Sequence, residues 1–395
     1  MKNRSILSGI LLLMFVLTAC GGHAPVSTPT VDPSAVAAVV STMIAGVPTA
    51  IPLPQPTVTL TPEPPTVLPR SLYYLAQDAN GKTQIYRLGR DGVTIAQITF
   101  EQDGVLDFDV SPIDGTLAYR LEDDLIVIDA NGNNRQLLVS QPNITFSPSP
   151  IWSPSGRSIV YESGGNIVQY SFDTNDSQIL VLGTDADAKW PISFSPDGSK
   201  LFLRRRVIPS SSGTGEGLIY DFASQILTPV PGKFCSTSLV TWNTTNTLFC
   251  SNSGYSGAGM PGLWMVNLVN GSAEKLIFSD SCPPCLNVVA PHQDTTGNLY
   301  YLYAESNNID TPLILSLVSA KSDGITDRVV LRPETFNVLK VLWSPNSNAL
   351  LILLSEDQTP SPTSLILVPL DSSLPVVTIM ADASTLFSYS LRWGP

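Results

Sequence analysis

Histidine, the side chain that most often serves as a catalytic acid or base, is scarce in this sequence. The 395 residues include only two histidines, His23 in a proline-rich stretch and His292 near a predicted turn. A catalytic triad that uses histidine is therefore nearly excluded. Asp107 and Asp109 stand two residues apart on a predicted strand, and two carboxylates are enough for glycoside hydrolysis. Paired-carboxylate chemistry is thus the enzymatic alternative, although Asp109 could simply face water.

Glycine-rich and acidic turns resemble ligand loops only superficially. Asp78–Gly81 and Asp129–Gly132 lack the distal glutamate and the alternating carboxylates of a calcium loop. Gly213–Gly217 lacks the lysine and the helix of a phosphate-binding loop. Hairpin turns and flexible loops explain these segments better. We therefore predict no cofactor and no metal.

One group of charged and aromatic residues has the composition of a contact surface. Its centre is the only basic run of the chain, which is either a solvated strand end or an anion-binding patch. An acidic connection with a tryptophan precedes this run, and a tyrosine stands in a later loop. The predicted contact residues are Arg204, Arg205, Arg206, Asp185, Asp187, Trp190 and Tyr255.

The chain has five cysteines, four of them in its second half. An even number in an exported chain favours disulfides, and Cys235, Cys250, Cys282 and Cys285 allow three pairings. Cys235 can reach Cys250, and the Cys-x-x-Cys pair then closes on itself or exchanges partners. A redox or metal role is disfavoured because no βαβ pattern or histidine ligand accompanies that pair.

The fifth cysteine follows an N-terminal export signal. A basic start precedes the uncharged apolar run Ile6–Leu17, which is too short to span a bilayer. The run ends in Leu17–Gly21, a segment that resembles the lipobox of bacterial lipoproteins. The resemblance implies a signal peptide over residues 1–19 and a lipid-modified Cys20, with stable anchoring by two or three acyl chains. The alternative is an ordinary signal peptide with an incidental cysteine.

A stalk follows the predicted lipid anchor over residues 20–70. This stretch holds eleven of the 33 prolines, mixed with threonine, valine and alanine. Such a composition cannot bury enough apolar surface to fold, and it predicts an extended spacer. Apolar residues at helical spacing indicate a possible short helix over residues 33–45. That helix is either marginal or a docking element for a partner or a lipid interface.

The remainder of the chain repeats one phrase. An apolar or aromatic residue is followed by Ser-Pro, by a turn with glycine or asparagine, and by an alternating strand. Copies stand at Val110–Gly115, Trp152–Gly156, Phe194–Gly198 and Trp343–Asn346, and the first three are spaced 42 residues apart. Proline sets φ for a turn, and glycine adopts positive φ. Each phrase therefore predicts a tight hairpin.

Degenerate copies continue the series at Trp242 and near Ala290–Pro291, and a final opening stands at Trp393. Four strands in about 45 residues are typical of propeller blades. Across Leu72–Pro395, the pattern resembles the TolB-type and related WD-like propellers of bacterial envelope proteins. The resemblance implies an all-β fold over residues 71–395, a single propeller of four-stranded blades, and the openings at residues 110, 152, 194, 242, 290, 343 and 393 predict seven of them.

The two ends of this region complement each other. The segment that starts at Leu72 contains three strands and lacks an innermost one, whereas Ser390–Trp393 is an innermost strand without a blade. Pairing the two would close the ring and remove its free edges. We therefore expect the C-terminal strand to join the N-terminal blade.

The longest predicted loops all fall on one face of the ring, in blades four to seven. They are Pro209–Gly217, Ser251–Gly262, Glu305–Pro312 and Ser355–Ser364. Lengthened loops on one sector are a usual place for recognition, and the predicted contact residues lie beside them. The alternative is drift in tolerant surface loops.

The net charge and the predicted lipid anchor together limit the classes of function that this chain could have. The formal net charge of −12 disfavours nucleic acid and electrostatic docking on a membrane. We expect a monomeric, non-enzymatic lipoprotein, anchored in the cell membrane or outer membrane and facing the extracytoplasmic side. Its propeller would recognise or scaffold a protein or a glycan. The alternatives are a carboxylate-based carbohydrate-active enzyme and a TolB-like component of envelope assembly or sensing.

Overall fold

The computed structural model describes the second of two compact units of the chain. The units are Met1–Pro62 and Glu63–Pro395. The described residues are 66–122, 124–140, 150–184, 186–207, 216–230, 239–252, 262–278, 285–306, 314–355 and 361–395. The predicted signal peptide, Cys20 and the possible helix over 33–45 lie outside them. Every regular element of the described part is a β-strand, and no helix there could cross a membrane.

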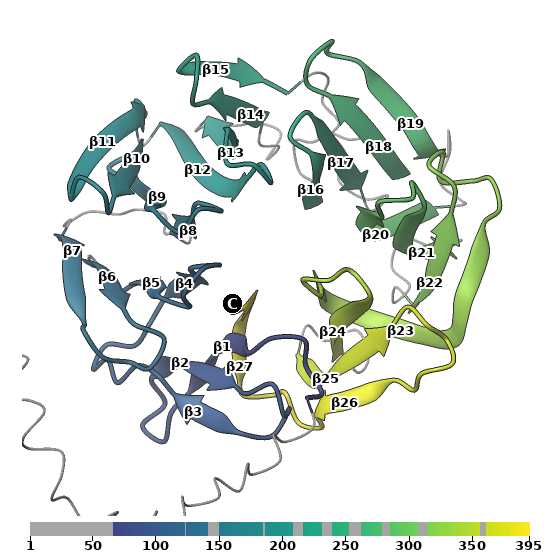
Figure 1. Cartoon of the computed structure of the whole chain (residues 1–395), viewed down its shortest axis with the longest axis horizontal. Helices are drawn as coiled ribbons and strands as arrows, with labels where there is room; N and C mark the ends of the chain where they lie inside the picture. Colours follow the sequence, from purple (N-terminus) through teal and green to yellow (C-terminus); the bar gives the residue numbers. More distant parts are fainter. Residues whose placement is uncertain are drawn as a thin grey trace, which may run out of the picture. The chain divides into compact units, whose positions relative to one another are not determined.

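These strands form seven blades of four antiparallel strands, arranged in a ring (Figure 1). Each of the first four blades is a separate sheet. Blade 1 contains β27 (Leu386–Trp393), β1 (Leu72–Gln77), β2 (Thr83–Leu88) and β3 (Ile95–Gln97). Blade 2 contains β4 (Asp107–Val110), β5 (Leu117–Arg120), β6 (Asp124–Ile128) and β7 (Gln136–Ser140). Blade 3 contains β8 (Ile151–Trp152), β9 (Ser158–Ser163), β10 (Asn166–Ser171) and β11 (Asp176–Val181). Blade 4 contains β12 (Asp187–Phe194), β13 (Lys200–Val207), β14 (Glu216–Asp221) and β15 (Ile226–Pro229).

The last three blades complete the ring, and two of them share a strand. Blade 5 contains β16 (Leu239–Thr244), β17 (Thr247–Asn252), β18 (Gly262–Asn267) and β19 (Ala273–Phe278). Blades 6 and 7 contain β20 (Cys285–Gln293), β21 (Leu299–Ser306), β22 (Ile314–Ala320), β23 (Val329–Trp343), β24 (Ala349–Ser355), β25 (Pro362–Pro369) and β26 (Val377–Met380). The first part of β23 pairs with β22 and the second part pairs with β24. One long strand is therefore the outer strand of blade 6 and the inner strand of blade 7.

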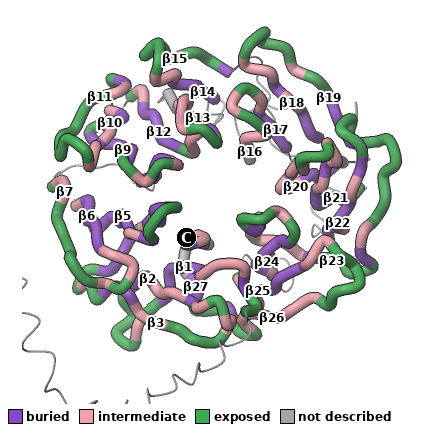
Figure 2. The backbone as a smooth tube through the Cα atoms, in the orientation of Figure 1, coloured by how far each residue is buried: buried purple, intermediate pink, exposed green. Residues whose placement is uncertain are grey.

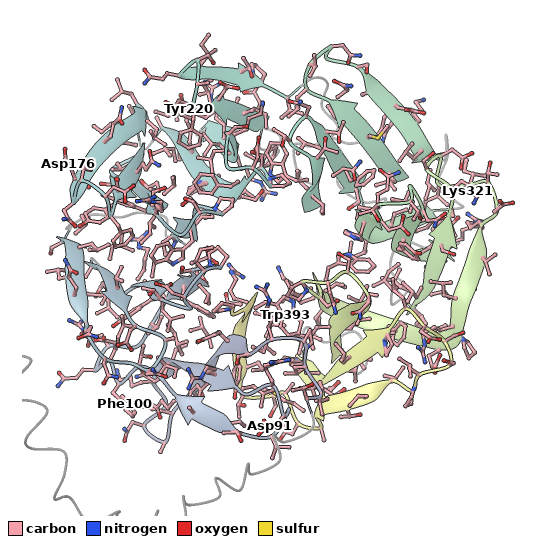
Figure 3. The ribbon with its side chains drawn as sticks, in the orientation of Figure 1. Asp91, Phe100, Asp176, Tyr220, Lys321 and Trp393 are labelled. Carbon is pink, nitrogen blue, oxygen red and sulfur yellow. The ribbon has the colours of Figure 1, made fainter. Side chains whose placement is uncertain are left out.

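The ring closes through its two ends, as the sequence predicts. The C-terminal strand β27 pairs antiparallel with β1, with Leu72 opposite Trp393 and Tyr74 opposite Leu391. The C-terminus lies beside β1 at the inner side of the ring (Figure 1), and Figure 3 shows Trp393 at the same place. The backbone groups of β1 thus have partners on both sides, so β1 is not an edge strand.

The serine of the repeated phrase has a structural role of its own. In blade 4 the Ser195 side chain is fully buried, and its hydroxyl oxygen accepts a hydrogen bond from the Lys200 N–H at 2.9 Å. Ser153 and Ser344 accept the equivalent bonds at 3.1 and 3.0 Å. Gly198 has the positive φ (75°) that the turn requires. The phrase thus supplies both the shape of the turn and an acceptor inside it.

The opening phrase of blade 6 lies later than predicted. The sequence places it near Ala290–Pro291, but β20 continues to Gln293 and the turn follows at Asp294–Asn298. A register shift between Val289 and His292 produces a bulge, in which Ala290 has φ 52°. The extra residues of a bulge interrupt the alternation of a strand and imitate the start of a turn. His292 is consequently part of a strand rather than a turn.

The core lies between neighbouring blades. Tyr73, Leu75 and Ile85 of blade 1 pack with Phe108 and Tyr119 of blade 2 in one buried cluster. Figure 2 shows that buried residues occupy the strands, whereas exposed residues gather at the rim and in the turns. Burial of apolar area between the sheets is therefore the main force that holds the blades together.

Tryptophan side chains connect consecutive inner strands. The indole N–H of Trp393 donates to the Trp343 carbonyl oxygen at 2.7 Å. The indole N–H of Trp343 in turn donates to the Ala290 carbonyl oxygen at 2.9 Å. Trp242 donates to the Ser193 hydroxyl at 3.0 Å. The inner strands of blades 5, 7 and 1 are thus each bonded to the preceding blade by an indole N–H.

The first residues after the proline-rich stretch already pack on the propeller. Leu68 is buried in a cluster with Leu72 and Leu367, and the N–H groups of Val67 and Leu68 both donate to the Arg90 carbonyl oxygen. The packed unit therefore includes residues that the sequence assigns to the end of the stalk.

Replacing Ser195 by alanine should reduce the free energy of unfolding by about 1–2 kcal/mol, because the Lys200 N–H loses its acceptor. Urea denaturation of the purified chain measures this change. Ser272, an exposed serine, provides the control, and Ser272→Ala should shift stability by less than about 0.5 kcal/mol. Equal stabilities of the two variants would show that the buried hydroxyl has no role in the turn.

Removing residues 386–395 should abolish the cooperative thermal transition and cause association, because β1 then presents an unpaired edge. Circular dichroism and size-exclusion chromatography report the two effects. Removal of the exposed Pro395 alone is the control and should leave both properties unchanged. A shortened chain that keeps the elution volume and the transition of the full chain would contradict closure through β27.

Candidate functional site

The structure brings four of the seven predicted contact residues together at one end of blade 4. Asp187 and Trp190 lie on β12, and Arg204 and Arg205 lie on the adjacent β13. Arg206 also belongs to β13, but its side chain lies outside the described part, as do Asp185 and Tyr255. The clustering follows from pairing, because β12 and β13 run antiparallel and place Trp190 directly opposite Arg204.

Two like charges face each other in the same pair of strands. Lys189 stands opposite Arg205 in the register, an arrangement that is unfavourable without a counter-ion. Asp187, two residues before Lys189, supplies that counter-ion on the same side of the sheet. Its carboxylate pairs with the Arg205 Nε at 2.6 Å and with the Lys189 Nζ at 3.0 Å.

A second carboxylate completes this cluster. The Nη1 of Arg205 lies 3.1 Å from the Oε2 of Glu216, at the start of β14. Hydrogen bonds from Arg205, followed by those from Lys189, lower the pKa of Asp187, and the same bond raises the pKa of Arg205. The guanidinium of Arg205 is thus occupied by two acids. These two ion pairs give Arg205 a structural role, and its part in a contact surface stays a prediction.

Sequence reasoning missed Lys189 and Glu216. The Lys189 side chain is buried, and its Nζ also donates to the Leu182 carbonyl oxygen at 3.3 Å. The alternation Asp187-Ala188-Lys189 could have indicated that the acid and the lysine share a face. Arg205 meets Glu216 because of the register between β13 and β14. The length of the loop between these two strands does not predict that register.

Arg204 differs from its neighbour Arg205. It is half-buried, and it forms no ion pair with any residue that the structure describes. Burial lowers the pKa of its guanidinium, which indicates a cation without local compensation. Arg204 and the half-buried Trp190 opposite it thus place a cation and an indole together on the other face of the sheet from the Asp187–Arg205 cluster.

The two candidate carboxylates are both engaged by the closing strand. Asp109 pairs with the Arg392 Nε at 2.9 Å and accepts the Trp152 backbone N–H at 2.8 Å. Asp107 accepts a hydrogen bond from the Ser390 hydroxyl at 2.9 Å. Burial raises the pKa of Asp109, although Arg392 favours its charged form. Neither carboxylate is arranged as an unoccupied acid or base.

Of the four cysteines in the second half of the chain, the structure describes the side chain of one. Cys250 is buried in β17 and takes part in a disulfide. Cys285 is the first residue of β20, with its side chain outside the described part, and Cys235 and Cys282 also lie outside it. The pairing of the four cysteines stays a prediction.

A wide groove of about 870 Å³ lies where the chain enters the propeller. Its lining includes Thr66–Pro69, Tyr300 of blade 6, and Leu367 and Leu374 of blade 7. The first described residues form part of the wall of this groove, and most of its lining surface is apolar.

Within the described ranges, no group of three or more histidine, cysteine or acidic residues could hold a metal ion.

No protein-family model and no curated protein matches the chain. Among solved structures, it is similar to a prolyl endopeptidase at a TM-score of 0.56 and 12% identity, covering 79% of this chain and 48% of that one. It is also similar to an oligogalacturonate lyase in complex with manganese at a TM-score of 0.53 and 11% identity, covering 78% and 84%. TolB from Acinetobacter baumannii matches at a TM-score of 0.44 and 14% identity, covering 82% of each chain. Such low identities show a likeness of fold alone, and the strand order establishes that this chain contains a seven-bladed β-propeller.

Proposed function

We propose that this chain is a lipid-anchored extracytoplasmic protein whose propeller recognises a protein partner at the bacterial envelope. The lipobox-like segment around Cys20 and the proline-rich stretch support the anchor and the spacer. The observation that carries the recognition role is Arg204, a half-buried cation without a counter-ion among the described residues. It stands opposite Trp190 in the register.

The composition of this surface suits binding better than catalysis. Arginine and tryptophan are enriched among the residues that dominate the energy of protein interfaces. The Asp187–Arg205–Glu216 cluster holds the end of β13 in place, so the partner would meet a preorganised surface. In an acidic chain, an uncompensated Arg204 favours a partner that offers a carboxylate. A glycan that carries carboxylates is the alternative ligand.

An enzymatic role is a second candidate, since Asp107 and Asp109 both line a cavity at the centre of the ring. The oligogalacturonate lyase and the prolyl endopeptidase named above are both enzymes, and their likeness in fold supports an enzymatic role as the second candidate. Recognition remains our first choice because Arg392, Trp152 and Ser390 occupy the two carboxylates. A TolB-like part in envelope assembly or sensing would be a special case of the recognition role.

Replacing Cys20 by serine should prevent lipidation and leave an uncleaved precursor. Labelling of cells with a radioactive fatty acid and fractionation of their membranes measure the effect. His23→Ser, three residues beyond the proposed modification site, is the control and should remain labelled and membrane-bound. A wild-type chain that takes up no label, or a Cys20→Ser chain that keeps it, would contradict the anchor.

Replacing Arg204 by methionine should reduce recovery of a crosslinked envelope partner at least tenfold, because the partner's carboxylate loses its only strong counter-ion in this contact. The bait is the full chain expressed in its own membrane, and quantitative mass spectrometry measures recovery. Arg157→Met is the matched control, since Arg157 is an exposed arginine paired with Asp173. Equal recovery with both variants would contradict this contact surface, and loss after glycosidase treatment would identify a glycan.

A further inference from the structure

The inner strands of five blades enclose a cavity of about 380 Å³ at the centre of the ring. Its walls come from β4, β8, β12, β23 and β27, so blades 1, 2, 3, 4 and 7 all contribute. The volume lies within the range of small-molecule sites in proteins. This cavity is separate from the ion pairs that hold the end of β13.

The cavity has a charged side and an apolar side. The charged side contains Asp107 and Asp109 of blade 2, Arg392 of blade 1 and Lys340 of blade 7. The apolar side includes Ile151 of blade 3 and Ile192 of blade 4. Ile192 is accessible, with 40% of its surface exposed.

Three of the four charged side chains of the cavity have a direct hydrogen-bond partner. The Nε of Arg392 binds one oxygen of Asp109 at 2.9 Å, and the Trp152 N–H binds the other at 2.8 Å. The Ser390 hydroxyl donates to Asp107 at 2.9 Å. These bonds fasten the closing strand to blade 2 and define the charged wall.

Lys340 is the exception. Its side chain is half-buried, and its ammonium group has no hydrogen bond or ion pair with any residue in the described ranges. Burial lowers its pKa, and the positive charge of Arg392 lowers it further, whereas Asp107 raises it. A partly buried cation without a direct partner costs free energy that an incoming anion would recover.

We propose that this central cavity binds a small organic carboxylate, whose carboxylate group pairs with Lys340 and whose aliphatic part lies against Ile151 and Ile192. The charged lysine selects the anion. The apolar wall selects a molecule with a hydrocarbon body over a compact, highly charged anion such as phosphate.

The test uses the full chain in a nonionic detergent and isothermal titration calorimetry with 4-methylpentanoate as the probe. Its neutral amide tests the need for charge, acetate tests the need for the aliphatic part, and inorganic phosphate tests for general anion binding. We expect 4-methylpentanoate to bind at least tenfold more tightly than each of these three. Binding of phosphate as tight as that of 4-methylpentanoate would overturn the proposed ligand class.

Variants test the residues. Lys340→Met keeps most of the side-chain length and should weaken binding of 4-methylpentanoate at least tenfold, and Ile192→Ala should weaken it by a smaller factor. Lys321→Met is the matched control, because Lys321 is an exposed lysine at the outer rim of the ring (Figure 3), and it should bind as the wild type does. Thermal melting establishes that each variant is folded. Undetectable binding by the folded wild type, or unchanged binding by folded Lys340→Met, would overturn the proposal.

Discussion

The antiparallel pairing of β27 with β1 is the interaction on which the rest of the structure depends. It joins the last strand of the chain to the first described strand, so that the ring is closed by backbone hydrogen bonds. The same strand carries Trp393, whose indole bonds to blade 7, and Arg392, whose guanidinium bonds to blade 2. One segment thus fastens three blades, and without it the apolar faces of neighbouring sheets would lose their circular arrangement.

Closure of the ring also brings together the residues that line its central cavity. Arg392 and Asp109 are 283 residues apart in sequence and form an ion pair only because the ends of the chain share a sheet. The cavity they line needs inner strands from five blades. A binding site of this kind is rigid, since each wall belongs to a different sheet that is held by its neighbours.

The partly buried cations of the described residues fall into two groups, those paired with a carboxylate and those without such a pair. In the cluster of blade 4, Asp187 and Glu216 neutralise Arg205, and Asp187 also stabilises the buried Lys189. Arg204 and Lys340 have no such partner among the described residues, although both are half-buried. Asp107 favours the charged form of Lys340 without pairing with it directly, and we propose both cations as positions at which an anionic group binds.

The repeated Ser-Pro phrase with its degenerate copies predicted the fold and the seven blades, because turn chemistry is local, and the complementary ends of the region predicted the closing strand. It failed at blade 6, where the bulge at Ala290 imitates a turn and the true turn begins at Asp294. Which charged side chains are neutralised and which line the central cavity could be decided only from the tertiary structure. Arg205 proved to be neutralised and Lys340 proved to face the centre, since both outcomes depend on register and on contacts between blades that no local pattern encodes.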